Sequence, residues 1–153
     1  MFWPSIHDIT TDPDDPPAFK ALLTRRAGRW VSPPEYDGPH AAAEQRRAYP
    51  DIQPLMVNGT LPRAFEAAVA SAREMGWEIV AADHNAARIE AIATTALLRF
   101  KDDIVVRFRE VGARVRVDVR SKSRLGRGDL GTNARRIRRF LARTRSHLAP
   151  TEA

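Results

Sequence analysis

One loop of the sequence combines residue types that can bind an anion. Ser121 and Ser123 offer hydroxyl groups, and Arg120 and Arg124 offer guanidinium groups. The stretch then continues into a predicted helix through further candidates: Gly126, Asp129, Gly131, Asn133 and Arg136. Hydroxyl groups, guanidinium groups and the free amides of a helix start can together hold a phosphate or a carboxylate. The sequence therefore predicts an anion-binding or partner-binding loop here.

A structural interpretation of the same loop stays open. Asp129 or Thr132 is expected to cap the following helix, and a carboxylate at that position repels an anion. The stretch "GRGDLG" also has the glycine spacing of a dinucleotide-binding turn, which requires a parallel strand and an acidic residue about 20 positions later. Glu152 instead lies in the tail. We therefore expect no nucleotide site, and glycines that only turn the chain into the helix.

The last predicted helix is crowded with arginine. Its basic side chains are Arg135, Arg136, Arg138, Arg139, Arg143 and Arg145. Because Ile137, Phe140 and Leu141 are expected to face the core, most of these arginines face solvent. Arg135, Arg138 and Arg139 define a predicted basic face, which is either only solvated or a contact for an anionic membrane surface or an acidic protein. No zinc-finger, ribonucleoprotein or recognition-helix pattern supports nucleic-acid binding.

Catalytic and metal-binding patterns are missing from the sequence. The histidines lack the spacing of metal ligands, and they are His7, His40, His84 and His147. The acidic run "HDITTDPDD" lacks the glycine and the closing glutamate of a calcium loop. There is no cysteine, and no serine lies in a nucleophile elbow. We therefore expect no catalytic residues, no metal and no cofactor, with Asp102 and Asp103 left open between a functional role and a strand-turn role.

The elements that position these residues are predicted from hydrophobic periodicity. They are a strand at 54–57, a helix at 60–76, strands at 77–82, 88–95, 103–110 and 114–120, and a helix at 130–148. The last strand alternates without a fault, with Val115, Val117 and Val119 inward and the charged residues from Arg114 to Arg120 outward. Short turns make the last four strands an antiparallel meander. Two helices must then cover one face of the sheet to bury the valines.

The predicted fold class is α+β, a TBP-like or helix-grip-like arrangement with an extended N-terminal arm. The arm, residues 1–53, is rich in proline and contains one short helix near "HAAAEQRRAY". Its apolar residues are too many for a free tail, so we expect it to pack across the α+β domain, residues 54–148. Residues 149–153 are expected to form a disordered tail.

Composition limits the class of protein. The chain has 153 residues, with 43% hydrophobic and 29% charged residues, as in a soluble globular domain. Of its 25 basic residues only Lys20, Lys101 and Lys122 are lysine, and the formal net charge is +6. No apolar run approaches the roughly 20 residues that a membrane-spanning helix needs.

Several stretches together resemble a bacterial and plant family, domain of unknown function 1499. They are "IHDITTDPDDPPAF", "YPDIQPL", "GWEIVAAD", "IEAIATT", "FKDDIVVR" and "DVRSKSRLGRGDLGTNARRIRRFL". The family's later motif corresponds here to Ser123, Arg124, Gly126, Asp129, Gly131, Asn133 and Arg136. Gly128, the middle glycine of "GRGDLG", is outside that motif. The resemblance implies no activity, but it implies a cell-envelope context, because many bacterial relatives carry membrane segments or a lipoprotein signal before this domain.

Two hypotheses of function follow. The first is a non-enzymatic binding or adaptor domain of the cell envelope that contacts an anionic partner through its basic face and the loop from Ser121 to Asn133. Under it, the protein is either tethered to a bacterial membrane or soluble, with a periplasmic location as one possibility. The second is a small-ligand domain with a pocket between sheet and helices, with an unrecognised hydrolytic step as an extension.

Overall fold

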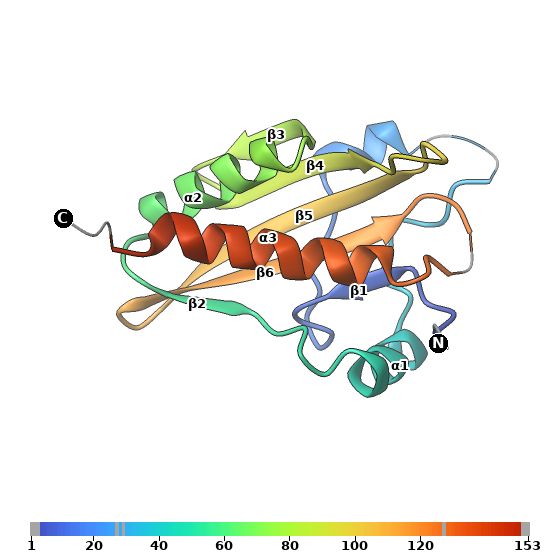
Figure 1. Ribbon diagram of the computed structural model, residues 1–153, viewed down its shortest axis with the longest axis horizontal. Coiled ribbons are helices and arrows are strands. Elements are labelled where there is room, and N and C mark those ends of the chain that lie inside the picture. Colours follow the sequence, from blue (N-terminus) through green and yellow to red (C-terminus); the bar gives the residue numbers. More distant parts are fainter. Residues whose placement is uncertain (1–3, 27, 29, 127, 151–153) are drawn as a thin grey trace.

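The computed structural model describes residues 4–26, 28, 30–126 and 128–150, and Figure 1 shows them as one sheet with helices. The strands are β1 (Asp8–Thr10), β2 (Leu55–Asn58), β3 (Glu78–Asp83), β4 (Arg88–Thr94), β5 (Lys101–Val111) and β6 (Arg114–Ser123). The helices are α1 (Pro39–Ala48), α2 (Leu61–Glu74) and α3 (Thr132–Leu148), with a short 3-10 turn, η1, at Ala21–Arg25. The predicted α+β class and the order strand, helix, four strands, helix are confirmed.

Local sequence signals place the ends of α2. The Thr60 side chain accepts a hydrogen bond from the Arg63 amide, so it caps the helix as predicted. Gly76 follows the helix with a φ of 74°, a conformation that favours glycine. Between these ends one face of the helix is buried, including Phe65 and Val69, which positions α2 against the sheet.

The sheet is antiparallel throughout, in the order β1-β6-β5-β4-β3. Two short strands cover the outer edge of β6 end to end: β2 pairs with its first residues and β1 with its last. The β1 strand was not predicted, because three residues in a proline-rich segment carry no periodic signal. This pairing ties the start of the chain to the strand that enters the candidate loop.

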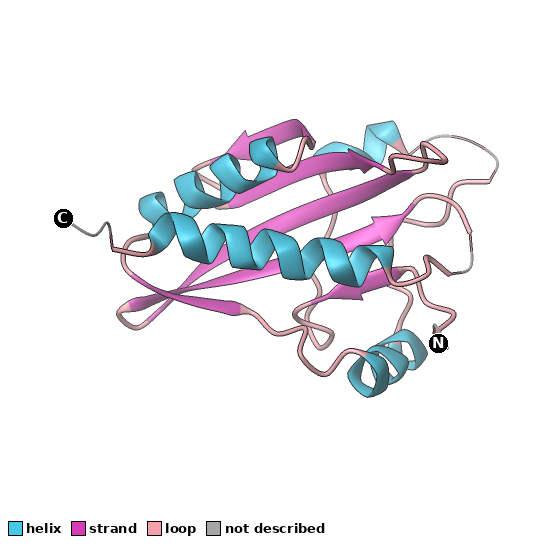
Figure 2. Ribbon diagram, viewed as in Figure 1, coloured by secondary structure: helices cyan, strands magenta, loops and turns pink. Residues whose placement is uncertain are grey.

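Helices α2 and α3 lie together across one face of the sheet (Figure 2). Beneath them the valines of β6 are buried with Ile104, Val106 and Phe108 of β5. Residues of the predicted arm join the same cluster, among them Ile6, Ile9 and Ile52. Arm and sheet therefore share one hydrophobic core.

The opposite face of the sheet is exposed only toward the hairpin between β5 and β6, where Arg109 and Arg114 lie. The expectation of an outward charged face on β6 was therefore wrong for the second half of this strand. The alternation itself is confirmed, yet Asp118, Arg120 and Lys122 are as buried as the valines. The arm crosses this face and buries Phe19 and Leu22 against Ile92 and Val105. Buried polar groups require partners, and the arm supplies them through its backbone and its carboxylates.

Glu90 of β4 shows how the arm is attached. Its carboxylate accepts hydrogen bonds from the backbone amides of Lys20, Ala21 and Leu22, at 2.7–3.2 Å. A carboxylate that accepts from several amides forms a strong, charge-assisted interaction. Glu90 therefore holds the η1 turn on the sheet. At the other end of the chain, the predicted tail lies outside the described residues from position 151 onward.

Candidate functional site

The loop after β6 is shaped by its glycines and capped by Asp129. Gly126 and Gly131 have φ values of 93° and 78°, whereas Gly128 has no positive φ. The Asp129 carboxylate accepts hydrogen bonds from the amides of Gly131 and Asn133, at 2.8 and 2.9 Å. The Thr132 amide donates to the carbonyl of Asp129, so three successive amides at the start of α3 are already bound by Asp129.

Asn133 is the centre of a buried network that includes most of the polar residues of the predicted loop. Its side-chain oxygen accepts from Ser121 Oγ at 2.5 Å and from Arg136 at 2.8 Å. Its amide group donates to Ser123 Oγ at 2.9 Å and to Asp129 at 2.7 Å. These bonds tie the end of β6 to the first turn of α3, so they stabilise the loop from within.

Arg136 continues this network to β5. Its guanidinium lies 2.7 Å from a carboxylate oxygen of Asp102, and both side chains are nearly buried. Burial raises the pKa of Asp102, and the charge of Arg136 opposes that rise. Arg136 of α3 therefore supplies the positive charge that stabilises the buried Asp102 carboxylate.

Asp103 joins three segments at one end of the sheet. Its fully buried carboxylate accepts from Arg26 of the arm at 2.5 Å and from Arg124 at 2.9 and 3.0 Å. Arg26 also donates to the carbonyl of Ser32, and the Ser32 amide donates to the carbonyl of Arg124. Asp103 therefore has a structural role, because its hydrogen bonds fix the loops at this end of the sheet relative to one another.

Arg120 points to the face covered by the arm. Its guanidinium forms two hydrogen bonds to Asp8, at 2.9 and 3.0 Å, and donates to the carbonyls of Pro17 and Pro34. Its carbon Cζ lies 4.4 Å from the centre of the Phe19 ring. Only 2% of Arg120 is exposed. It therefore stabilises the arm, and it lies apart from the Asn133 network on the other face of the sheet.

The three arginines of the predicted basic face of α3 differ in the contacts that they make. Arg138 donates two hydrogen bonds to Asp51, at 2.6 and 2.9 Å, and this lowers the pKa of Asp51. Arg135 donates to the carbonyl of Leu130 and to Thr132 Oγ1. Arg139 is exposed and forms no hydrogen bond or ion pair with any residue that the structure describes. Of the three, Arg139 has its charge directed to solvent.

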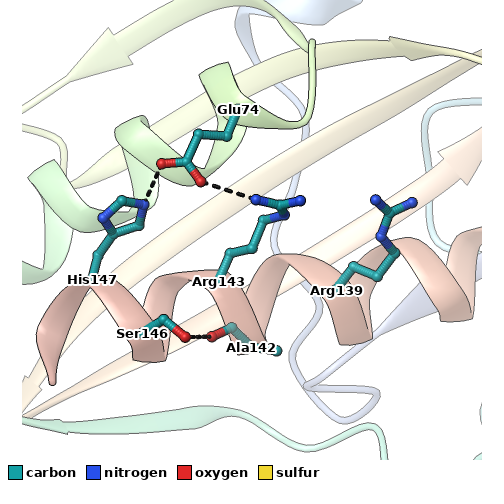
Figure 3. A pocket seen from close by; sticks show the side chains of 6 residues that line it. All are labelled: Glu74, Arg139, Ala142, Arg143, Ser146 and His147. Carbon is teal, nitrogen blue, oxygen red and sulfur yellow. Dashed lines mark hydrogen bonds and ion pairs between the residues drawn. The ribbon is translucent and has the colours of Figure 1, made fainter.

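Arg139 lines a hollow between α3 and the end of α2 (Figure 3), with a volume of about 540 Å³. The acidic member of this hollow is Glu74, which is bound to His147 at 2.6 Å and to Arg143 at 3.1 Å. Both oxygens of Glu74 are therefore in use. Arg139 lies beside this cluster in Figure 3 without a bond to it.

A second surface feature lies at the end of the sheet where β4 joins β5, at the right of Figure 1. Large apolar side chains are exposed there on three neighbouring segments. We call them the end surface: Trp30, Leu97, Leu98, Phe100, Leu125 and Leu130. Leu97 is 88% exposed and Leu98 64%. Such a cluster is unusual on a protein surface that contacts only water.

The loop that carries Leu97 and Leu98 is held by its own backbone. The amides of Arg99 and Phe100 donate to the carbonyl and the side-chain oxygen of Thr95, and the Thr95 amide donates to the carbonyl of Phe100. The exposed leucines are therefore fixed on a turn. Sequence reasoning missed them, although two adjacent leucines in "TTALLRF" stand where a strand connection normally has polar residues.

The partners of the buried cations were also missed. Asp8, Asp37 and Arg26 lie in the arm, more than 70 positions from Arg120, Lys122 and Asp103, which they contact. The only signal was the acidic composition of the arm beside the arginine-rich strands. Complementary charge indicates that two segments can pair, but it does not say which residues meet.

Among the described residues, no group of three His, Asp or Glu side chains is arranged to hold a metal ion. None of the helices in the described ranges has the length and apolar character needed to cross a membrane. The glycine pattern of "GRGDLG" also lacks the context of a dinucleotide-binding turn, because β6 is antiparallel to β1, β2 and β5.

These observations define a class: an α+β domain whose antiparallel sheet is covered by two helices on one face and by its own N-terminal arm on the other. Residues 8–143 match the model of a family described as protein of unknown function (DUF1499). The chain therefore belongs to this family, as the sequence motifs implied. A comparison with curated proteins found no match.

Proposed function

We propose that this domain is a non-enzymatic module that binds an anionic membrane surface through its end surface. The observation that carries the proposal is the exposure of Leu97 and Leu98 on a fixed turn. Inserting such side chains into the boundary between headgroups and acyl chains removes them from water. Because the turn is already ordered, little conformational entropy is lost on insertion.

The composition of the end surface favours a lipid bilayer over a protein partner. Tryptophan, leucine and phenylalanine side chains are suited to the depth just below the headgroups. Arg99 and Lys101, both exposed, flank the leucines and suit anionic headgroups. The net charge of +6 attracts the whole protein toward such a surface.

The test is binding to vesicles of phosphatidylglycerol mixed with phosphatidylcholine, compared with phosphatidylcholine alone, at low and high salt. We expect stronger binding to the anionic vesicles, weakened by salt. Replacing Leu98 by Ser is expected to reduce binding severalfold. Val111→Ser is the matched control, because Val111 is also exposed but lies on the hairpin at the opposite end of the sheet.

A second pair of variants tests the contribution of charge to vesicle binding. Arg99→Gln is expected to weaken anionic binding, whereas Arg114→Gln, an exposed arginine beside the distant hairpin, is expected to have little effect. Equal binding by all variants, or binding that ignores lipid charge and salt, would refute the proposal. Specific capture of a protein with loss on Leu98→Ser, and no vesicle binding, would replace the membrane by a protein partner.

A further inference from the structure

A groove on the helix side of the molecule adjoins the end surface. It lies between the end of α2, the end of β4 with its following loop, and the first half of α3, and it has a volume of about 560 Å³. Pockets of a few hundred cubic ångströms hold small ligands. The sequence predicted three of its arginines, Arg135, Arg136 and Arg139, as parts of the loop and the basic face, but it did not predict that they line one groove with apolar residues.

The groove has an apolar part and a cationic part. Met75, Trp77 and Leu97 line the apolar part, and the Trp77 ring stacks on Phe140 in the core with their centres 5.0 Å apart. The side formed by α3 carries Arg135, Arg136 and Arg139. This arrangement suits a ligand with a charged end and an apolar end.

The charge of the groove is not neutralised within it. Among the described residues that line it, none is acidic. Arg136 is paired with Asp102, and Arg139 forms no hydrogen bond or ion pair within the part of the chain that the structure describes. The nearby Glu74 is occupied by Arg143 and His147 (Figure 3). Arg139 is therefore the cation that an incoming anion meets.

We propose that this groove binds an amphiphile with a phosphate head and an aliphatic chain. The phosphate accepts hydrogen bonds from Arg139. The chain lies against Met75 and Leu97. The inference rests on the proposed function only for the source of the ligand, which is a membrane lipid because Leu97 belongs to both the groove and the end surface.

The test uses the full chain and soluble probes, so that no bilayer is needed. Binding of octyl phosphate below its micelle concentration is measured by calorimetry and by amide chemical shifts, beside octyl glucoside and inorganic phosphate. We expect saturable binding of octyl phosphate and much weaker binding of the other two. The weak binding of inorganic phosphate would separate an amphiphile site from a simple phosphate site.

Variants assign the binding to the groove. Arg139→Gln is expected to weaken octyl phosphate binding about tenfold, as for the loss of one charge-assisted hydrogen bond. Arg145→Gln, an exposed arginine of α3 outside the groove, is the matched control. No saturable binding of octyl phosphate, equal binding of octyl glucoside or inorganic phosphate, or an effect of Arg139→Gln no larger than that of Arg145→Gln would overturn the inference.

The two proposals fail in different ways. Leu98 does not line the groove, so Leu98→Ser is expected to reduce vesicle binding and to leave octyl phosphate binding unchanged. Octyl phosphate binding without vesicle binding would support the groove and refute the membrane role. Vesicle binding without octyl phosphate binding would support the membrane role and refute the groove.

Discussion

The buried pair between Asp8 and Arg120 allows a quantitative prediction for Asp8→Asn. Asp8 is completely buried, and its two oxygens accept both hydrogen bonds that Arg120 makes to a carboxylate. Asparagine has a similar shape but no charge, so the variant leaves the Arg120 cation buried without a counter-charge. Breaking such a pair costs about 3–5 kcal/mol of unfolding free energy.

Asp51→Asn is the matched control. It removes a carboxylate that also accepts two hydrogen bonds from one arginine, Arg138, but both side chains of this pair are 40% or more exposed. An exposed pair contributes at most about 1 kcal/mol because water screens it. Both variants therefore remove a carboxylate that is bonded twice to one arginine, and they differ mainly in burial; Asp8 also accepts from the Asp37 amide and lies 3.6 Å from Lys122 Nζ.

The assay is urea unfolding followed by circular dichroism, with a thermal melt beside it. For Asp8→Asn we expect an unfolding free energy lower by about 4 kcal/mol and a melting temperature lower by about 10 °C for a domain of this size. For Asp51→Asn we expect a loss within about 1 kcal/mol. In the Asp8→Asn background, Arg120→Gln is expected to cost less than it does alone, because the unpaired charge is then removed.

Equal losses for Asp8→Asn and Asp51→Asn would refute the reasoning. They would mean that the face of the sheet beneath the arm is hydrated in solution. An unchanged melting temperature with faster proteolysis of the arm would lead to the same conclusion, because the arm would then be detached.

The arm gives two further predictions. Burial raises the pKa of Tyr36 to about 12 and also raises that of Tyr49, so absorbance at 295 nm is expected to show less tyrosinate at pH 10.5 in the folded protein than in the unfolded protein. The raised pKa of Tyr36 contributes stability that is present below the unfolded value of about 10 and is lost as the pH rises through about 12. Half of the tyrosine ionised near pH 10, with a native circular dichroism spectrum, would contradict this prediction. Glu90→Gln is expected to increase hydrogen exchange at the amides of Lys20, Ala21 and Leu22 at least tenfold, because each loses a charged acceptor. A mass-spectrometric comparison with helix α3 as internal reference tests this, and unchanged exchange at these three amides would show that the arm is held elsewhere.

The sequence by itself determined the elements whose signals are local. The valines of β6 alternate with polar residues, so their strand and their shared face follow from the period of two. Helix α2 follows from a three- and four-residue periodicity between Thr60 and Gly76. Of the two predicted caps, Asp129 and Thr132, Asp129 accepts a hydrogen bond from the Asn133 amide, although Gly131 holds the N-cap position itself. In each case the residues that interact lie within a few positions of one another.

For the candidate site, the sequence identified the residues of the loop but not their partners. Ser121, Ser123, Asn133 and Arg136 do come together, as their grouping in the predicted loop implied. Their hydrogen bonds are directed to one another, which residue type alone does not reveal. The end surface and the apolar part of the groove were not predicted, because exposure at Leu97 depends on what the fold leaves uncovered.

Only the tertiary structure decided what covers the second face of the sheet. An alternating pattern shows which residues share a face, and charged residues on that face predict solvent unless another segment brings partners. Here the arm brings Asp8 to Arg120 from 112 positions away. Because a contact over that distance depends on the path of the whole chain, no local signal in β6 indicates that its charged face is buried.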